Sequence, residues 1–176
     1  GGVITSGASS LLRELAQKAN VPVTTTLMGL GAFPEDDELA LHMLGMHGTV
    51  YANYAVTHSD LLMSIGARFD DRITGKVEEF APEATVVHVD IDPTSIGKNV
   101  GVDIPVVGDA TEVLEGMLEQ VEYRERAQWL NRVREWKEDF PLAYEKEPGV
   151  VKPQAVMEEI DRITDGEAII ATDVGQ

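Results

Sequence analysis

Residues whose types could do chemistry gather in four short segments rich in glycine, aspartate and arginine. They are Thr26-Leu27-Met28-Gly29, Gly66-Ala67-Arg68-Phe69-Asp70, Asp90-Ile91-Asp92 and Gly108-Asp109-Ala110. Glycine lets a backbone approach a ligand closely, a guanidinium suits pyrophosphate, and carboxylates accept hydrogen bonds from ribose hydroxyls. The four segments together favour a site for an extended dinucleotide, although glycine and aspartate are also ordinary turn residues.

The second segment continues into Asp71 and Arg72, so that Arg68, Asp70, Asp71 and Arg72 place four charges within five residues. On an exposed turn such pairs contribute ~0–1 kcal/mol. A partly desolvated arginine that faces an anionic ligand contributes more, about 1.5–3 kcal/mol per hydrogen bond. The residues by themselves leave both interpretations open.

Other constellations carry weaker signals. His42 and His47 are five residues apart, whereas two metal ligands on one helix face are three or four apart, so no metal site is expected. Gly29-x-Gly31 does not continue into G-x-G-x-x-G, and there is no Walker A motif, which argues against standard NAD binding and nucleotide hydrolysis.

The stretch that contains Met43, Met46, His47 and Gly48 has no clear period. It is compatible with the lining of a pocket and equally with plain packing.

The elements that position these segments alternate along the chain. Short β-branched runs predict strands at residues 21–25, 61–65, 86–89, 104–107 and 168–172. Helical patterns cover residues 9–19 after the capping serines Ser9 and Ser10, residues 50–57, a stretch from about Ala110 in which Asp109 is the expected cap, residues 123–140, and a stretch that starts at Pro153. This alternation predicts an α/β fold with a doubly wound, Rossmann-like parallel sheet and helices on both faces. In such sheets ligands bind at the carboxyl ends of the strands, where the four segments lie.

Three parts of the chain are expected to differ in role. Residues 1–140 form the main domain, the charged stretch 141–152 is a linker, and residues 153–176 begin another domain. Both ends look cut, because the chain opens on the Gly1-Gly2 turn with no strand before it and closes directly after a predicted strand. We therefore expect a fragment whose first strand is clipped.

Composition limits the partners and the compartment. The 176 residues carry 14 basic and 31 acidic side chains, a net charge of -17, which disfavours nucleic acid and anionic membrane surfaces. There is no cysteine, which fits a cytoplasmic protein, and no apolar run reaches the ~18 residues of a membrane helix.

Longer motifs resemble one family closely, the large catalytic subunit of acetohydroxyacid (acetolactate) synthase. The matching stretches of its central domain are residues 26–31, Leu41-His42-Met43-Leu44-Gly45-Met46-His47-Gly48, residues 66–75, Val89-Asp90-Ile91-Asp92 and Ile96-Gly97-Lys98-Asn99. Asp173-Val174-Gly175-Gln176 resembles the start of its thiamine-diphosphate domain. The resemblance covers essentially the whole chain.

The resemblance implies an enzyme that uses thiamine diphosphate and Mg²⁺ to condense two pyruvates, or pyruvate and 2-oxobutyrate, with loss of CO₂. The reaction belongs to branched-chain amino acid biosynthesis, and the middle domain holds an FAD that takes no net part in redox chemistry. It also implies a homodimer or homotetramer with a small regulatory subunit.

Site residues carried over by position fall into two groups. The cofactor contacts would be Gly1, Gly2, Thr26, Leu27, Leu44, Gly45, Met46, His47, Gly66, Ala67, Arg68, Phe69, Asp70, Asp90, Ile91, Asp109 and Ala110, with Gln176 meeting thiamine diphosphate. Asp71 and Arg72 would face the substrate channel. The family's catalytic glutamate and metal-diphosphate motif have no counterpart here, so the chain alone is expected to be inert.

Two rival hypotheses remain. One is the middle domain of a flavin-free thiamine-diphosphate decarboxylase or carboligase, in which the sequence Arg-Phe-Asp-Asp-Arg is not expected. The other is a packing or regulatory module whose acidic helix at residues 123–140 meets a partner.

Overall fold

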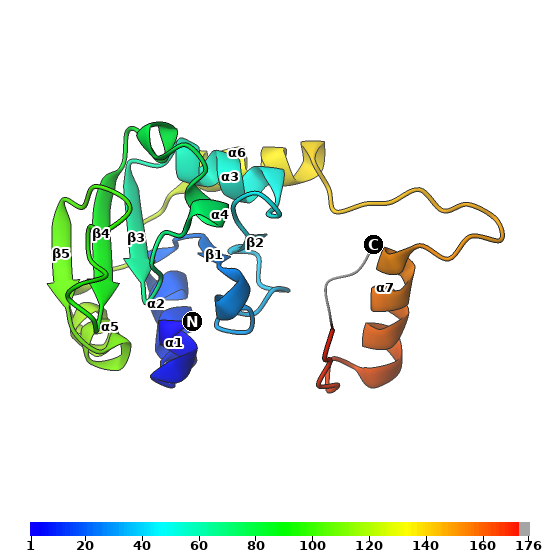
Figure 1. Cartoon of the computed structure of the whole chain (residues 1–176), viewed down its shortest axis with the longest axis horizontal. Helices are drawn as coiled ribbons and strands as arrows, with labels where there is room; N and C mark the ends of the chain where they lie inside the picture. The colour runs from blue at the N-terminus through cyan, green and yellow to red at the C-terminus, as the bar shows by residue number, and fades with distance from the viewer. Residues whose placement is uncertain (173–176) are drawn as a thin grey trace. The chain divides into compact units, whose positions relative to one another are not determined.

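The computed structural model describes residues 1–172 and contains two compact units, Gly1–Phe140 and a second that begins at Pro141. Helices and strands alternate through most of the first unit (Figure 1). In chain order its elements are α1 (Gly2–Thr5), α2 (Ser9–Ala19), β1 (Val23–Thr25), the 3-10 turn η1 (Leu27–Gly29), β2 (Ala40–Met43), α3 (Val50–Thr57), β3 (Leu61–Ile65), α4 (Asp71–Thr74), the 3-10 turn η2 (Val77–Glu79), β4 (Thr85–Asp90), β5 (Ile104–Val107), α5 (Ala110–Gln120) and α6 (Ala127–Asp139).

The strands form two parallel sheets. β3, β4 and β5 lie in that order, with Leu61 opposite Thr85 and Val87 opposite Ile104. β1 pairs with β2 in a separate sheet, and the register shifts between Val23 and Thr25. All these pairs are parallel, so the carboxyl ends of neighbouring strands meet at one edge.

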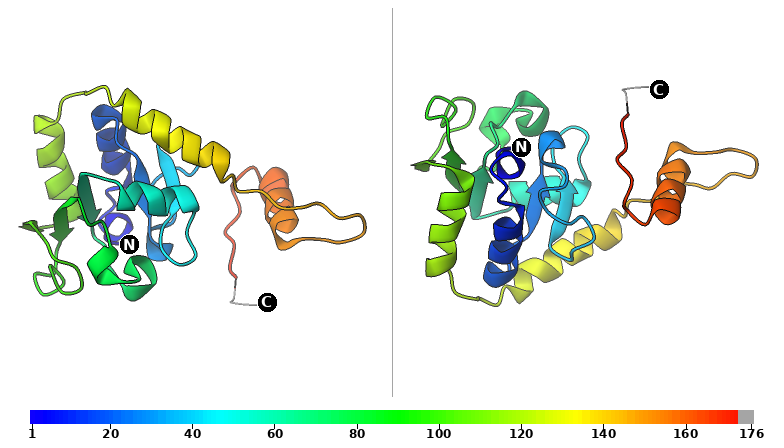
Figure 2. Two further views of the ribbon diagram at one scale, coloured as in Figure 1. Left: turned by 90° about the horizontal axis from the view of Figure 1, so that it is seen from above. Right: turned by 90° about the horizontal axis from the view of Figure 1, so that it is seen from below.

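Helices cover both faces of the strands, as a doubly wound fold requires. Leu62 and Ile65 lie three residues apart on β3 and therefore point to opposite faces. Leu62 packs in a cluster with α3 and α6, whereas Ile65 packs in a cluster with α2 and α5. In both views of Figure 2, α2 and α5 run next to each other. The α/β, Rossmann-like prediction is confirmed.

The strands differ from the prediction in two ways, since those of the first unit form two sheets instead of one and the separate strand predicted at residues 168–172 is absent. Among the described residues β1 pairs with β2 alone, β3 pairs with β4 alone, and residues 168–172 form no strand. A strand needs a neighbour for its backbone N–H and C=O groups, and none is present beside residues 168–172 in this part of the chain. The strand predicted there is wrong for the described structure.

Element boundaries show smaller differences. The strand predicted at residues 21–25 begins at Val23, because Pro22 has no N–H and the Val21 N–H closes the end of α2 on the Ala16 carbonyl at 3.0 Å. The cap of α2 is Ala8 rather than Ser9 or Ser10, which lie inside the helix. The helix predicted at residues 123–140 is shorter, spanning Ala127–Asp139.

β2 is the strand that sequence patterns missed. It has four residues, none of them β-branched, and His42 within it has a φ of 61°. A left-handed residue inside a short strand leaves no alternation to detect.

In the second unit, residues 141–152 form no helix or strand and precede α7 (Pro153–Thr164), with Pro153 in the first turn as predicted. No residue of α7 is buried. Gln176 and its neighbours 173–175, which carry the resemblance to a thiamine-diphosphate domain, lie outside the described residues. Among residues 1–172 there is no helix long and apolar enough to cross a membrane.

Candidate dinucleotide site

A cavity of about 740 Å³ opens at the carboxyl ends of the strands in the first unit. Its size lies in the range of roughly 300–1,000 Å³ that small-molecule sites occupy. Loops after β1, β3 and β4, the start of α5 and the turn after β2 all contribute to its wall. The predicted residues that line it are Gly1, Gly2, Thr26, Leu27, Leu44, His47, Gly66, Ala67, Arg68, Asp70, Asp71, Arg72, Asp90, Ile91, Asp109 and Ala110.

Three predicted residues do not line the cavity. The Phe69 side chain is 6% exposed and packs with Val86 and Val100, its ring 5.0 Å from that of His88 in an edge-to-face arrangement. Gly45 and Met46 lie in the turn beside the cavity. Phe69 therefore anchors its loop in the core, while the flanking Arg68 and Asp70 reach the cavity.

Two glycines allow the start of α1 and the loop after β3 to touch. The Gly2 N–H donates to the Gly66 carbonyl at 3.0 Å. A Cβ placed on Gly66 would lie 2.6 Å from the Gly2 Cα, and Gly66 has a φ of +60°. No larger residue fits at this contact without moving the backbone. Gly2 and Gly66 both line the cavity, and their contact forms what we call the cavity floor.

Charges of both signs surround the cavity. Arg68 Nη2 lies 3.1 Å from Asp70 Oδ2, and both side chains are more than half exposed. Such an exposed pair contributes ~0–1 kcal/mol, so the guanidinium can exchange Asp70 for an anionic ligand at little cost.

Asp90, at the end of β4, and Asp109, after β5, supply two further carboxylates to the cavity wall. Asp90 Oδ1 accepts from the Asp92 N–H at 2.9 Å, and Asp109 Oδ1 accepts from the Thr111 N–H at 2.8 Å. The second bond confirms Asp109 as the cap of α5. In each carboxylate the other oxygen is available to accept a ligand hydroxyl, as a ribose or ribityl chain would require.

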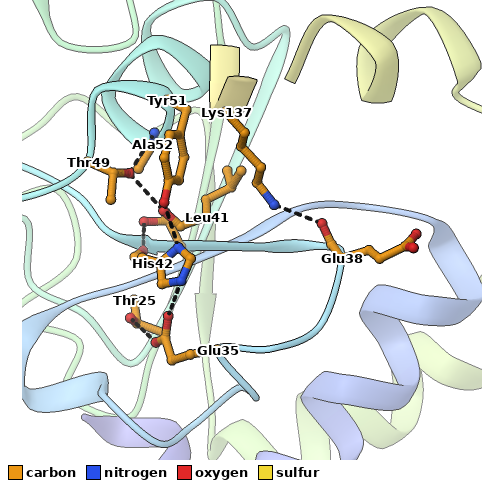
Figure 3. Close-up of polar contacts among 10 residues, drawn as sticks. Thr25, Glu35, Glu38, Leu41, His42, Thr49, Tyr51, Ala52 and Lys137 are labelled. Carbon is orange, nitrogen blue, oxygen red and sulfur yellow. Dashed lines mark hydrogen bonds and ion pairs between the residues drawn. The ribbon is translucent and has the colours of Figure 1, made fainter. Parts of the chain in front are cut away.

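A polar network fixes the end of β2 beside the site (Figure 3). Tyr51 Oη lies 2.9 Å from His42 Nδ1, and the Thr25 hydroxyl donates to Glu35 Oε1 at 3.3 Å. The other Glu35 oxygen is 3.8 Å from His42 Nε2. Burial raises the pKa of the Tyr51 hydroxyl; the Thr49 hydrogen bond opposes this and the Glu35 charge adds to it. These contacts hold the chain just before the turn at residues 44–48.

Glu35, Tyr51 and Asn53, whose side chain hydrogen-bonds Gly45, were not predicted from the sequence. His42 was quoted there only in the family motif and in a pair too widely spaced for a metal. Their partners lie on separate elements, and no motif or spacing marks them. Met28, Met43 and Gly108 were noted in the sequence but not chosen as contacts, and they line the cavity with Thr5, Ser6, Ile73 and Val89.

Comparison with known proteins connects this cavity to a family. Residues 1–117 match the family model described as thiamine pyrophosphate enzyme, central domain. This match covers more than half of the chain and contains every strand of the fold.

Relatives with known names match along the whole chain. It is 48% identical to the acetolactate synthase large subunit of Haemophilus influenzae and 46% identical to the acetolactate synthase isozyme 3 large subunit of Escherichia coli, covering 100% of this chain and 32% of each relative. It is also 48% identical to the chloroplastic acetolactate synthase of Arabidopsis thaliana, covering 100% of this chain and 27% of the relative. The chain thus spans less than a third of the length of these relatives. With its parallel strands, its helices on both faces and its cavity at the carboxyl edge, the chain belongs to the central-domain family of thiamine pyrophosphate enzymes.

Proposed function

We propose that this chain is the flavin-holding part of an acetolactate synthase large subunit. The observation that carries the proposal is the cavity at the carboxyl ends of both sheets, which gathers most of the residues inferred from the sequence. The names of the relatives support the same activity. In the whole protein the reaction would condense two pyruvates, or pyruvate and 2-oxobutyrate, with loss of CO₂.

The residues present fit an FAD. Gly1, Gly2 and Gly66 line the cavity without side chains, and Arg68 supplies an exposed guanidinium for a pyrophosphate. Asp90 and Asp109 can accept hydrogen bonds from hydroxyls, while the largely exposed Leu27, Met28 and Ile91 offer apolar surface to rings. In this role FAD would be a structural cofactor, without net redox turnover.

Thiamine diphosphate and Mg²⁺ would be supplied from other parts of the protein. We assign Asp71 and Arg72 to the substrate channel, because they line the cavity at the start of α4. Gln176, which we assign to thiamine diphosphate, lies outside the described residues.

Residues 141–152 would be a linker, and residues 153–176 would begin the thiamine-diphosphate domain. The exposed Val156, Met157 and Ile163 of α7 support this, since an amphipathic helix normally packs its apolar side against a core. The whole protein would be a cytoplasmic homodimer or homotetramer, and the term large subunit in the relatives' names fits a small regulatory partner.

A cofactor test separates this function from its nearest rival. The full-length protein should copurify with FAD and form acetolactate from pyruvate only with thiamine diphosphate and Mg²⁺. Removal of FAD should abolish activity, and added FAD should restore it. Activity that survives complete removal of flavin would refute the assignment and favour a flavin-free thiamine-diphosphate carboligase, which the same family model admits.

A matched pair of arginine variants tests the cavity itself. Arg68→Ala removes a guanidinium from the cavity wall, whereas Arg13→Ala removes one from the exposed side of α2. We expect Arg68→Ala to weaken FAD binding by about tenfold or more, as loss of one hydrogen bond to a charged group does. Equal affinities in the two variants would place the flavin elsewhere.

A third role, as a packing or regulatory module, predicts capture of the small subunit by this chain without flavin.

A further inference from the structure

Asn53 of α3 holds one residue of the turn beside the cavity by two hydrogen bonds. The Gly45 N–H donates to Asn53 Oδ1 at 2.8 Å, and Asn53 Nδ2 donates to the Gly45 carbonyl at 3.0 Å. A side-chain amide can do this because it presents a donor and an acceptor side by side. The pair of bonds copies the exchange between two residues of neighbouring antiparallel strands. Asn53 itself does not line the cavity.

Gly45 needs such support because of its conformation. Its φ is +91°, and a Cβ there would lie 2.4 Å from the Arg72 carbonyl oxygen. The chain has left β2 at this point, so no strand pairs with the Gly45 N–H. A second contact, from the Gly48 N–H to the Gly45 carbonyl at 3.0 Å, closes the turn but leaves the Gly45 N–H to Asn53 alone among the described residues.

The next residue of the turn reaches the charged loop. The Met46 N–H donates to the Arg72 carbonyl at 2.9 Å, and Arg72 Nη1 lies 3.9 Å from Met46 Sδ. The 44–48 turn and the start of α4 are therefore linked directly by these contacts. A shift of Gly45 would be passed to Arg72 through Met46.

We propose that Asn53 is a positioning residue for the cavity: it fixes the 44–48 turn and, through Met46, the backbone of Arg72. Leu44 and His47 are then held toward the cofactor, and Arg72 is held toward the substrate. This inference rests on the proposed flavin site.

Loss of the Asn53 amide should leave α3 folded, because the helix has its own anchor. The Thr49 hydroxyl accepts from the Ala52 N–H at 3.1 Å and donates to the Leu41 carbonyl at 2.9 Å. Asn53→Leu keeps similar bulk and removes both bonds to Gly45, whereas Asn53→Asp keeps the acceptor. Ser59→Ala is the matched control, since it removes one hydrogen bond, from the Ser59 hydroxyl to the Val56 carbonyl at 2.9 Å, just past the end of α3 that lies away from the turn.

The experiment uses the full-length protein with FAD as the probe. We expect Asn53→Leu to raise the Kd of FAD by about 10- to 100-fold, because two hydrogen bonds and two buried polar groups are affected. Asn53→Asp should fall between it and the wild type, and Ser59→Ala should change the Kd by less than about threefold. With saturating FAD, Asn53→Leu should raise the KM for pyruvate more than it lowers kcat.

Hydrogen exchange supplies a readout that does not depend on flavin. Backbone amides of residues 44–49 should exchange faster in Asn53→Leu than in Ser59→Ala. Equal Kd values in these two variants, with equal exchange, would overturn the positioning role. If the wild type binds no FAD, the proposed function fails, and the exchange rates alone decide whether Asn53 holds the turn.

Discussion

Replacement of Gly66 by alanine tests the contact that forms the cavity floor. The new Cβ would lie 2.6 Å from the Gly2 Cα and 3.0 Å from the Gly2 nitrogen, while ordinary contacts of this kind begin at 3.4 Å. The two segments would have to separate by roughly 1 Å, which also stretches the bond from the Gly2 N–H to the Gly66 carbonyl. Overpacking costs about 1–3 kcal/mol, and loss of one hydrogen bond adds about 1 kcal/mol.

The cost of the left-handed backbone conformation must be subtracted from the measured loss of stability. Gly66 has a φ of +60°, at which alanine is disfavoured by about 1–2 kcal/mol. Gly97→Ala is the matched control, because Gly97 has a φ of +69° and nothing within 4 Å of its Cβ position. The difference between the two variants isolates the overlap with Gly2. We expect Gly66→Ala to lower the free energy of unfolding by about 2–4 kcal/mol more than Gly97→Ala.

Urea denaturation followed by tryptophan fluorescence measures this difference. Both tryptophans, Trp129 and Trp136, lie on α6 in the first unit, so the signal reports that unit. FAD binding by the full-length variant should weaken in parallel. Free energies of unfolding that agree within about 0.5 kcal/mol would refute the close approach of Gly2 and Gly66.

Three further perturbations have defined outcomes. Asp109→Ala should lower the free energy of unfolding by about 1 kcal/mol through loss of the α5 cap, and Asp109→Asn by much less, in the same urea assay; equal losses would contradict the cap. His88 is 1% exposed, and neither ring nitrogen has a hydrogen-bond partner within residues 1–172, so His88→Leu should stabilise the first unit by about 1–3 kcal/mol; a loss of stability would show a hidden partner. Burial raises the pKa of the Tyr51 hydroxyl, so the folded state holds this proton more tightly than the unfolded chain, and the stabilisation is lost as pH rises from about 10 through the folded pKa. Fluorescence-detected unfolding above pH ~10 should therefore fall more steeply with pH for the wild type than for Tyr51→Phe, and parallel curves would contradict the shift.

Local patterns predicted the elements whose residues carry their own signals. β3 and β5 have the predicted bounds, because each is a run of apolar residues with turn residues after it. The prediction of α5 succeeded because its cap and its apolar side are both local signals: Asp109 caps the helix, and Leu114 is fully buried. The segments after β1, β3 and β4 could be placed at one edge because parallel strands bring their carboxyl ends together.

Features that depend on distant partners could not be predicted. The positive φ of His42 is maintained by contacts with Tyr51 and Thr24, nine and eighteen residues away in the chain. Asn53 has no sequence signature, because its role depends on where the turn after β2 passes α3. The burial of the Phe69 side chain was not predicted either. Its backbone has a φ of 53°, and its side chain packs in the core while those of Arg68 and Asp70 line the cavity.

The separation of the two sheets is related to the geometry of the site. Residues 24–26 and 62–65 line the same small cavity of about 100 Å³, so β1 and β3, which do not pair with each other, border one space. Gly2 is bonded to Gly66 at the carboxyl end of β3, which is where a parallel strand in that space would end. Such a strand would supply backbone partners to both β1 and β3 and join the sheets into one. It would also fix the Gly1-Gly2 turn at the cavity floor, so completion of the sheet and formation of the dinucleotide site would be the same structural event.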